Sequence, residues 1–214
     1  MKRRPEPEVM DLPEEARAYA QADFADVNAA FVECLTELTV GIDSAHALDL
    51  GTGPADIAFR VASVRPDWRI VAVDASYAML KLAQPVNQHN LHLVQADAKA
   101  LPFKDRCFDV IFSNSILHHI TDTGRFWLQV RRVATPGAFV FLRDLARPEN
   151  ESAARAVVEQ YSGGESELLK EEFFRSLLAA YTPQEVRPQL ASAGLVRLEV
   201  KMSSDRHLDI VGRI

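Results

Sequence analysis

ALDLGTGPAD, residues 47–56, is the stretch that decides the fold. The apolar run at 47–50 reads as the end of a buried strand, and Gly51 and Gly53 follow it directly. Glycine accepts a positive φ and lets the backbone approach a ligand closely, because it has no Cβ. A helix that starts after such a turn presents unpaired N–H groups to a polar ligand. The stretch predicts a strand, a turn and a helix around a small polar ligand, although a plain tight turn would show the same glycines.

Outward from this stretch, short apolar runs alternate with helical patterns up to residue 142, which is typical of βαβ units and a parallel sheet. The runs are almost continuously apolar, as strands are when helices cover both faces of their sheet. The expected strands are 45–50, 69–73, 91–95, 108–113 and 138–143, and the expected helices are 55–64, 77–82 and 124–133. The pattern predicts an α/β fold with a Rossmann-like, doubly wound, mostly parallel sheet.

Helical patterns precede this core. After an opening rich in Pro and Glu, one helix is expected from Asp11, with Glu14 at the capping-box position, and a second from Ala25 to Thr39. We expect residues 1–44 to form an arm and a helical lid, and residues 45–214 to form the binding domain.

The C-terminal third adds a helical cap insertion at about 148–181, with helices over 153–161 and 165–180. The sequence TPQE at 182–185 predicts a helix start, with Thr as N-cap, Pro at the first helical position and Glu reaching back. The segments 195–202 and 207–211 predict an antiparallel strand pair that closes the edge of the sheet.

The composition of the whole chain bounds its function. A length of 214 residues suits one domain, and the net charge of −6 disfavours nucleic-acid binding. Cys34 and Cys107 lie far apart without neighbouring His or Cys at ligand spacing, so no disulfide and no metal site is expected. No apolar window is long enough to span a membrane and no signal sequence is recognisable, so a cytoplasmic protein is expected.

Two acidic residues, one of them after the second expected strand, limit the class of ligand. Asp74 follows the last glycine by about 20 residues, where a carboxylate can receive both ribose hydroxyls. Asp56 stands where dinucleotide-binding proteins have a third glycine, and its negative charge would oppose a diphosphate. A nucleoside cofactor without phosphates fits these residues best.

Four segments in order resemble motifs of the class I S-adenosylmethionine-dependent methyltransferases. They are LDLGTGP at 48–54, VDASYAML at 73–80, QADA with LPF at 95–98 and 101–103, and FDVIFSNSILHHI at 108–120. Ala55 departs from the glycine usual in that family. The resemblance implies S-adenosyl-L-methionine as cofactor and S-adenosyl-L-homocysteine as product.

The resemblance also implies roles for residues. Asp74 would bind the ribose, Met79 would lie beneath the adenine, Asp97 would accept from the adenine amino group, and the Ala98 amide would face a ring nitrogen. The end of the fourth strand would meet the methionine moiety and the acceptor. The expected cofactor-binding residues are Asp49, Gly51, Gly53, Asp74, Ala75, Met79, Asp97, Ala98, Asn114 and Ser115.

Four residues are candidates for catalysis. His118 and His119 follow the fourth strand, where a neutral imidazole can act as a base, although the pair can equally cap or pack the loop. Asp144 ends the fifth strand and either orients the acceptor or pairs with Arg143. Tyr181 lies where a cap returns to the site.

The leading hypothesis is methyl transfer to a small molecule by a monomer or homodimer, without nucleic-acid or membrane partners. Two alternatives stay open. One is an enzyme that converts the cofactor to a small amino acid and methylthioadenosine, and the other is a non-catalytic binding subunit with the same fold.

Overall fold

The protein is described by a computed structural model that covers residues 1–7, 9, 16, 24–83 and 88–214. The helix expected from Asp11, with its Glu14, lies outside the described residues.

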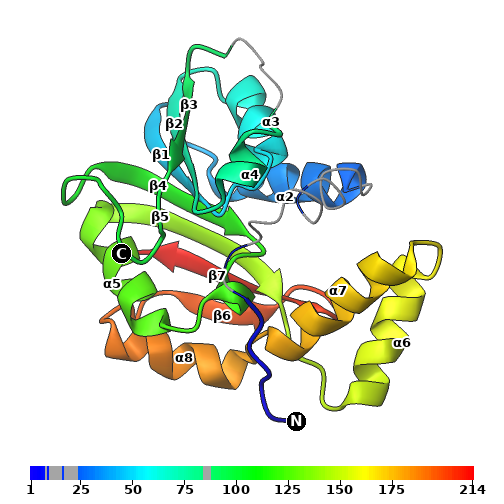
Figure 1. The fold of residues 1–214 in the computed structure, drawn as a ribbon. Helices are drawn as coiled ribbons and strands as arrows, with labels where there is room; N and C mark the ends of the chain where they lie inside the picture. Colours follow the sequence, from blue (N-terminus) through cyan, green and yellow to red (C-terminus); the bar gives the residue numbers. More distant parts are fainter. Residues whose placement is uncertain (8, 10–15, 17–23, 84–87) are drawn as a thin grey trace.

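A seven-stranded sheet forms the centre of the molecule, with strand order β3-β2-β1-β4-β5-β7-β6 (Figure 1). β1 to β5 pair in parallel, whereas β7 pairs antiparallel with β5 and with β6. The strands are β1 Ala45–Leu50, β2 Trp68–Asp74, β3 Leu91–Gln95, β4 Phe108–Asn114, β5 Ala134–Leu145, β6 Glu199–Met202 and β7 His207–Arg213. The predicted fold class is confirmed, including the C-terminal strands that close the sheet.

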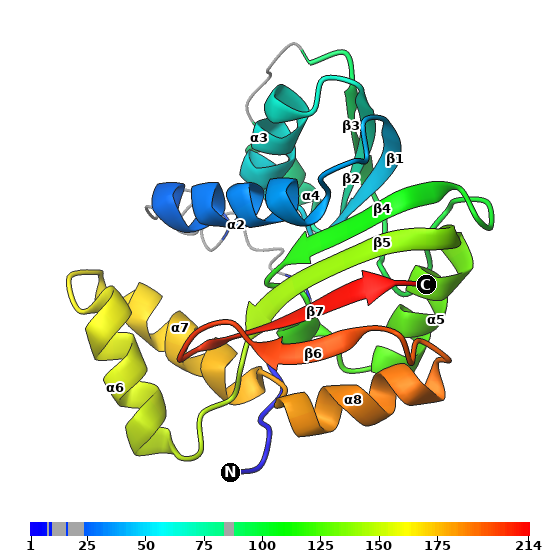
Figure 2. The ribbon, with the colours of Figure 1, turned by 180° about the vertical axis from the view of Figure 1, so that it is seen from behind.

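Helices cover both faces of the sheet, as the apolar strands predicted. On one face, Phe31 and Leu35 of α2 (Ala25–Leu38) and Val61 of α3 (Asp56–Val64) are buried against the strands. On the other face, α5 (Thr123–Val133) and α8 (Pro183–Ser192) complete the larger core, as Figure 2 shows from behind. The second predicted helix therefore packs in the core, with Phe31 fully buried and stacked on Phe141 at 4.9 Å between ring centroids.

Two helices, α6 (Glu151–Ser162) and α7 (Glu167–Ala179), follow β5 and pack on each other with a small core of their own (Figure 1). They correspond to the predicted cap insertion. The TPQE prediction is also confirmed, because Thr182 and Glu185 form a complete capping box at the start of α8. Whether 1–44 and 45–214 are separate units stays a prediction.

The N-terminal segment, residues 1–7, lies against the carboxyl edge of the sheet. The Arg4 amide donates to the Leu178 carbonyl at 3.0 Å, and the Arg3 side chain donates to the carbonyls of Ala179 and His118. The first seven residues are thereby placed beside the short 3-10 helix η1 (Leu117–His119) and the end of α7.

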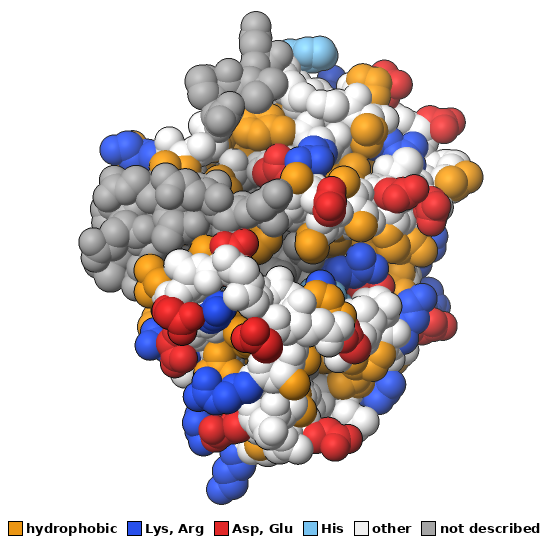
Figure 3. Space-filling model, turned by 90° about the vertical axis from the view of Figure 1, so that its right-hand side faces the viewer, with side chains coloured by type: hydrophobic (Ala, Val, Ile, Leu, Met, Phe, Trp, Pro, Cys, Tyr) orange, Lys and Arg blue, Asp and Glu red, His pale blue; other side chains and the backbone are white. Residues whose placement is uncertain are grey.

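The described surface carries charges of both signs. On the face in Figure 3, Lys and Arg side chains alternate with Asp and Glu and form no continuous basic stripe among the described residues. Within the described part of the chain, no helix is long and apolar enough to cross a membrane.

Candidate functional site

The register of the parallel strands brings the predicted site residues to one edge of the sheet. Leu50 pairs with Val73, Asp74 with Gln95, and Asn114 with Arg143, so the segments that follow β1, β2, β3 and β4 start side by side. Carboxyl ends of parallel strands are where α/β proteins bind ligands. All ten expected cofactor-binding residues lie on or directly after these strand ends, or at the short helix α4 (Tyr77–Leu80).

The amides of the glycine turn bind to β2. The amides of Gly51 and Thr52 donate to the Val73 carbonyl at 2.8 and 2.9 Å, and the Gly53 amide donates to the Asp74 carboxylate at 2.7 Å. These N–H groups therefore fasten β1 to β2, and the N–H groups expected to face a ligand are those at the start of α3. Gly51 has φ +70°, and a Cβ there would lie 2.8 Å from Ile116 Cγ1, so only glycine fits.

Asp74 is held in one orientation by backbone amides. Its Oδ2 accepts from Gly53 and its Oδ1 from the Ser76 amide at 2.8 Å. Burial raises the pKa of this carboxyl, while the amides of Ser76, Gly53 and Ala75 counteract the shift. The two oxygens have four lone pairs in all, so at least one remains for a ligand hydroxyl beside these three amides.

Asp49, two residues before Gly51 in β1, is almost completely buried at 2% exposure. The Thr52 hydroxyl donates to it at 2.7 Å. Burial is the main cause that raises its pKa to about 7, with a smaller contribution from the charge of Asp74. A buried carboxyl that is near its pKa at neutral pH favours a cationic partner.

The adenine-side candidates differ in exposure. Asp97 is exposed and pairs with Lys99, whose Nζ lies 3.0 Å from Oδ1, whereas Ala98 and Met79 are buried. The negative charge of Asp56 was expected to oppose a diphosphate. In the structure Asp56 accepts from Asn28 at 2.9 Å and from Arg60 at 2.7 Å. These contacts partly neutralise its charge, so its repulsion of a diphosphate is weaker than expected.

Ser115, directly after β4, has a backbone conformation that is uncommon for a residue other than glycine. It has φ +63°, and its amide donates to the Arg143 carbonyl at 2.9 Å. The chain is thereby turned sharply from Asn114 into η1, and η1 carries both histidines.

Asp144 and His118 form a buried pair at the other end of this edge. His118 Nδ1 lies 2.6 Å from Asp144 Oδ1, and Asp144 also accepts from the amides of Leu117 and Leu145. Burial opposes charge on His118, but the charge and hydrogen bond of Asp144 outweigh it and raise the pKa of the imidazole. The predicted alternative, a pair between Asp144 and Arg143, is wrong, because Arg143 binds Asp209 at 2.7 Å.

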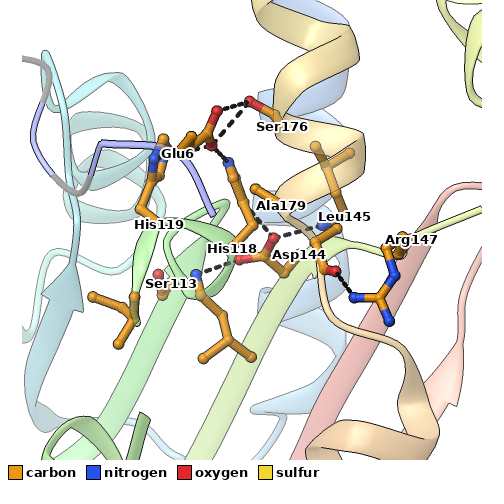
Figure 4. A network of polar contacts seen from close by, with 12 residues as sticks. Glu6, Ser113, His118, His119, Asp144, Leu145, Arg147, Ser176 and Ala179 are labelled. Carbon is orange, nitrogen blue, oxygen red and sulfur yellow. Dashed lines mark hydrogen bonds and ion pairs between the residues drawn. The ribbon is translucent and has the colours of Figure 1, made fainter. Parts of the chain in front are cut away.

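Glu6 joins the two histidines from the N-terminal segment, as Figure 4 shows. Its Oε1 lies 3.5 Å from His118 Nε2 and 3.2 Å from His119 Nδ1. Burial raises the pKa of Glu6, whereas burial and the neighbouring charge of His118 lower the pKa of His119 to about 3. Sequence reasoning missed Glu6, because an acidic residue in an opening rich in Pro and Glu carries no spacing that points to His118.

Tyr181 makes contacts within the protein. Its hydroxyl donates to the Ile120 carbonyl at 2.8 Å, and the Arg3 guanidinium lies 4.1 Å from the centre of its ring. The polar run at 203–207 is a largely exposed turn, and the Tyr161 hydroxyl donates to Asp205 within it.

The edge therefore has two chemical halves. The half around Asp49, the glycine turn and Asp74 offers carboxylate oxygens fixed by backbone, which suits hydroxyl and cationic groups of a cofactor. The half around Glu6, His118, His119 and Asp144 can hold a proton or a cation. The two halves are joined by the segment from Asn114 to His119.

Comparisons with known proteins agree with the sequence motifs. Residues 48–142 match the family model described as a methyltransferase domain. Among curated relatives, the demethylmenaquinone methyltransferase of Roseiflexus castenholzii is 28% identical over 156 residues, covering 65% of this chain and 66% of the relative. The malonyl-[acyl-carrier protein] O-methyltransferase of Geobacter sulfurreducens is 30% identical over 165 residues, covering 75% and 59%.

Solved structures share the fold. A SAM dependent methyltransferase from Aquifex aeolicus superposes with a TM-score of 0.69 at 18% sequence identity, covering 95% of this chain and 98% of that one. The chain spans less than two thirds of the length of the curated relatives named above.

Proposed function

We propose, because the chain belongs to the class I S-adenosylmethionine-dependent methyltransferase family, that it transfers a methyl group from S-adenosylmethionine to a small-molecule acceptor. The observation that carries the proposal is the Asp74 carboxylate, whose two oxygens are fixed by the amides of Gly53 and Ser76 at the ligand-binding edge of the sheet. A monomeric or homodimeric state stays a prediction.

The residues present fit the cofactor. Asp74 keeps at least one lone pair for a ribose hydroxyl, and Gly51 and Gly53 keep side chains away from the turn beside it. Met79 and Ala98 add a buried apolar surface for the adenine, and Asp97 adds an exposed acceptor for its amino group. The cofactor, when bound, supplies a methyl group on a positively charged sulfur.

The charge of the site fits the rest of that molecule. Asp49 is buried next to the turn, and we assign to it the stabilisation of the cationic part of the cofactor. Asn114 and Ser115 start the segment that we assign to the methionine moiety, since the positive φ of Ser115 turns the chain across the edge there.

The acceptor side lies at η1 and the end of β5. Asp144 fixes His118 in one orientation, and Tyr181 fixes the Ile120 carbonyl after η1. We assign positioning to Asp144 and Tyr181, and contact with the acceptor to the His118 and His119 segment. In-line transfer depends largely on such positioning, which can supply about 7–11 kcal/mol of a barrier.

Calorimetry with S-adenosylhomocysteine tests the cofactor, and mass spectrometry of incubations with S-adenosylmethionine tests the reaction. Binding of S-adenosylhomocysteine, together with its formation in the presence of candidate quinone, acyl-thioester and amine acceptors, is the expected result. Methylthioadenosine as the main product would indicate cofactor cleavage instead. The absence of any binding heat or thermal shift would contradict the proposal altogether.

A further inference from the structure

Three side chains from two distant parts of the chain point to one place. Glu6 comes from the N-terminal segment, and His118 and His119 come from η1 (Figure 4). One possible ligand atom from each lies within 4.8 Å of the other two. We propose that Glu6, His118 and His119 bind one divalent transition-metal ion such as Zn²⁺, with an open coordination position.

The separations fit a metal ion. Ligands about 2.05 Å from a tetrahedral Zn²⁺ lie about 3.3 Å from one another. Glu6 Oε1 lies 3.5 Å from His118 Nε2 and 3.2 Å from His119 Nδ1, so two of the three edges already have this length. The ligand atoms of the third pair, His118 and His119, lie within 4.8 Å of each other.

Outer contacts orient these ligands as they do in metal sites. Metal-binding His residues commonly hydrogen-bond a carboxylate through their second ring nitrogen. His118 does so through Nδ1 to Asp144 at 2.6 Å, which directs Nε2 toward Glu6. Ser176 donates to Glu6 at 3.2 Å and holds that carboxylate in turn.

His119 supplies an independent observation. Its Nδ1 is buried and makes no hydrogen bond to any residue that the structure describes, although it lies 3.2 Å from the Glu6 oxygen. A buried polar atom without a partner is costly in free energy. A metal ion between the two groups would satisfy it, and a neutral imidazole is the form that binds metals.

The donor set indicates the class of ion. Two imidazoles and one carboxylate bind Zn²⁺ in catalytic sites, where three protein ligands leave one position for water or another ligand. The Arg3 guanidinium lies close by, since it donates to the His118 carbonyl at 2.7 Å, and its charge opposes the ion. The charges of Glu6 and Asp144 offset it. None of its ligands is assigned to the cofactor, and His118 and His119 lie on the segment assigned to the acceptor, so the ion would sit on the acceptor side of the site.

The test uses residues 1–214 without a histidine tag. Zn²⁺ content after dialysis, affinity by chelator competition, and the visible spectrum with Co²⁺ are measured for the wild type, Glu6→Gln and His119→Gln. Glu149→Gln and His92→Gln are matched controls, because both side chains are exposed and lie outside the three-residue cluster. We expect one equivalent of Zn²⁺ and a four-coordinate Co²⁺ spectrum, with affinity at least tenfold weaker in the two site variants only.

Glu6→Gln keeps size and shape, so loss of folding does not confound it, and the melting temperature checks this. Zn²⁺ should raise that temperature in the wild type and not in Glu6→Gln. Equal affinity in the wild type and Glu6→Gln, or no uptake by the wild type, would overturn the proposal. These measurements need neither cofactor nor acceptor, so their failure would leave the calorimetric test of the proposed function standing.

Discussion

The Gly53 amide donates to Asp74 Oδ2 at 2.7 Å, which ties the turn after β1 to the last residue of β2. One carboxylate thus fixes the glycine turn and offers its remaining lone pairs to a ligand. The shape of the turn and the affinity of the site are expected to depend on the same side chain.

Asp74→Ala should weaken S-adenosylhomocysteine binding at least tenfold, because each lost hydrogen bond to a charged group costs about 1.5–3 kcal/mol. Calorimetry measures the affinity. Asp67→Asn is the control, since Asp67 is exposed and precedes β2 at its opposite end. Unchanged affinity in Asp74→Ala would refute the assignment of the ribose.

Gly51→Ala should destabilise the protein more than Gly41→Ala. Both glycines have positive φ, +70° and +85°, so both substitutions cost about 1–2 kcal/mol of backbone strain. Only at Gly51 would the new Cβ meet Ile116, at 2.8 Å, whereas nothing lies within 4 Å at Gly41. Urea unfolding measures both variants.

The double variant Gly51→Ala with Ile116→Ala isolates the contact. It should be less destabilised than the sum of the two single variants, because the clash disappears when the Ile116 side chain is truncated. Strict additivity would show that strain alone makes glycine necessary there.

Asp49 predicts a pH dependence of the free protein. Its folded pKa of about 7 lies above the ordinary value of 3.8, so the folded state binds more protons than the unfolded state between these values. Stability should therefore fall as pH rises from about 4 to about 7. Asp49→Asn should flatten this part of the profile, as measured by urea unfolding across that range.

Cofactor binding should release a proton from the same group. A cation beside Asp49 favours the ionised carboxyl, so the bound state binds fewer protons and affinity rises with pH up to about 7. Calorimetry at pH 6 in buffers of different ionisation enthalpy should show release of nearly one proton. Release of equal size in Asp49→Asn would assign the proton to another group.

The sheet and its strand ends were predictable, because they depend on local patterns. Apolar runs gave the parallel strands, and TPQE gave the capping box at Thr182. The hydrogen-bond partners of the amides at 51–53 were not predictable, because Val73 and Asp74 come close to them only through the pairing of β1 with β2. The predicted pair between Arg143 and Asp144 was wrong for a similar reason. Asp209 lies opposite Arg143 in the antiparallel pairing of β5 with β7, and it binds the guanidinium.

The candidate site was predictable only in part. Asp49 and Asp74 lie at the carboxyl ends of β1 and β2 and Asp97 follows β3, so topology alone places them on one edge. Glu6 lies on a segment without regular structure, and it reaches His118 because Arg3 holds that segment on the Ala179 and His118 carbonyls. Such a contact depends on tertiary packing that no periodicity encodes.

Arg3 gives the last prediction, because two effects of opposite sign meet there. Its positive charge repels the proposed metal ion, whereas its hydrogen bonds to the Ala179 and His118 carbonyls hold Glu6 in place. Arg3→Lys keeps the charge and loses the planar fork that makes both contacts. If anchoring dominates, as we expect, Arg3→Lys and Arg3→Ala both weaken Zn²⁺ binding about tenfold, the lower end of the loss found for residues that hold metal ligands in place. If repulsion dominates, Arg3→Ala binds Zn²⁺ more tightly and the Zn²⁺ affinity of Arg3→Lys is unchanged.

Arg4→Ala is the control, because its ion pair with Glu151 is exposed and such pairs contribute about 0–1 kcal/mol. Chelator competition on the three variants separates the two effects.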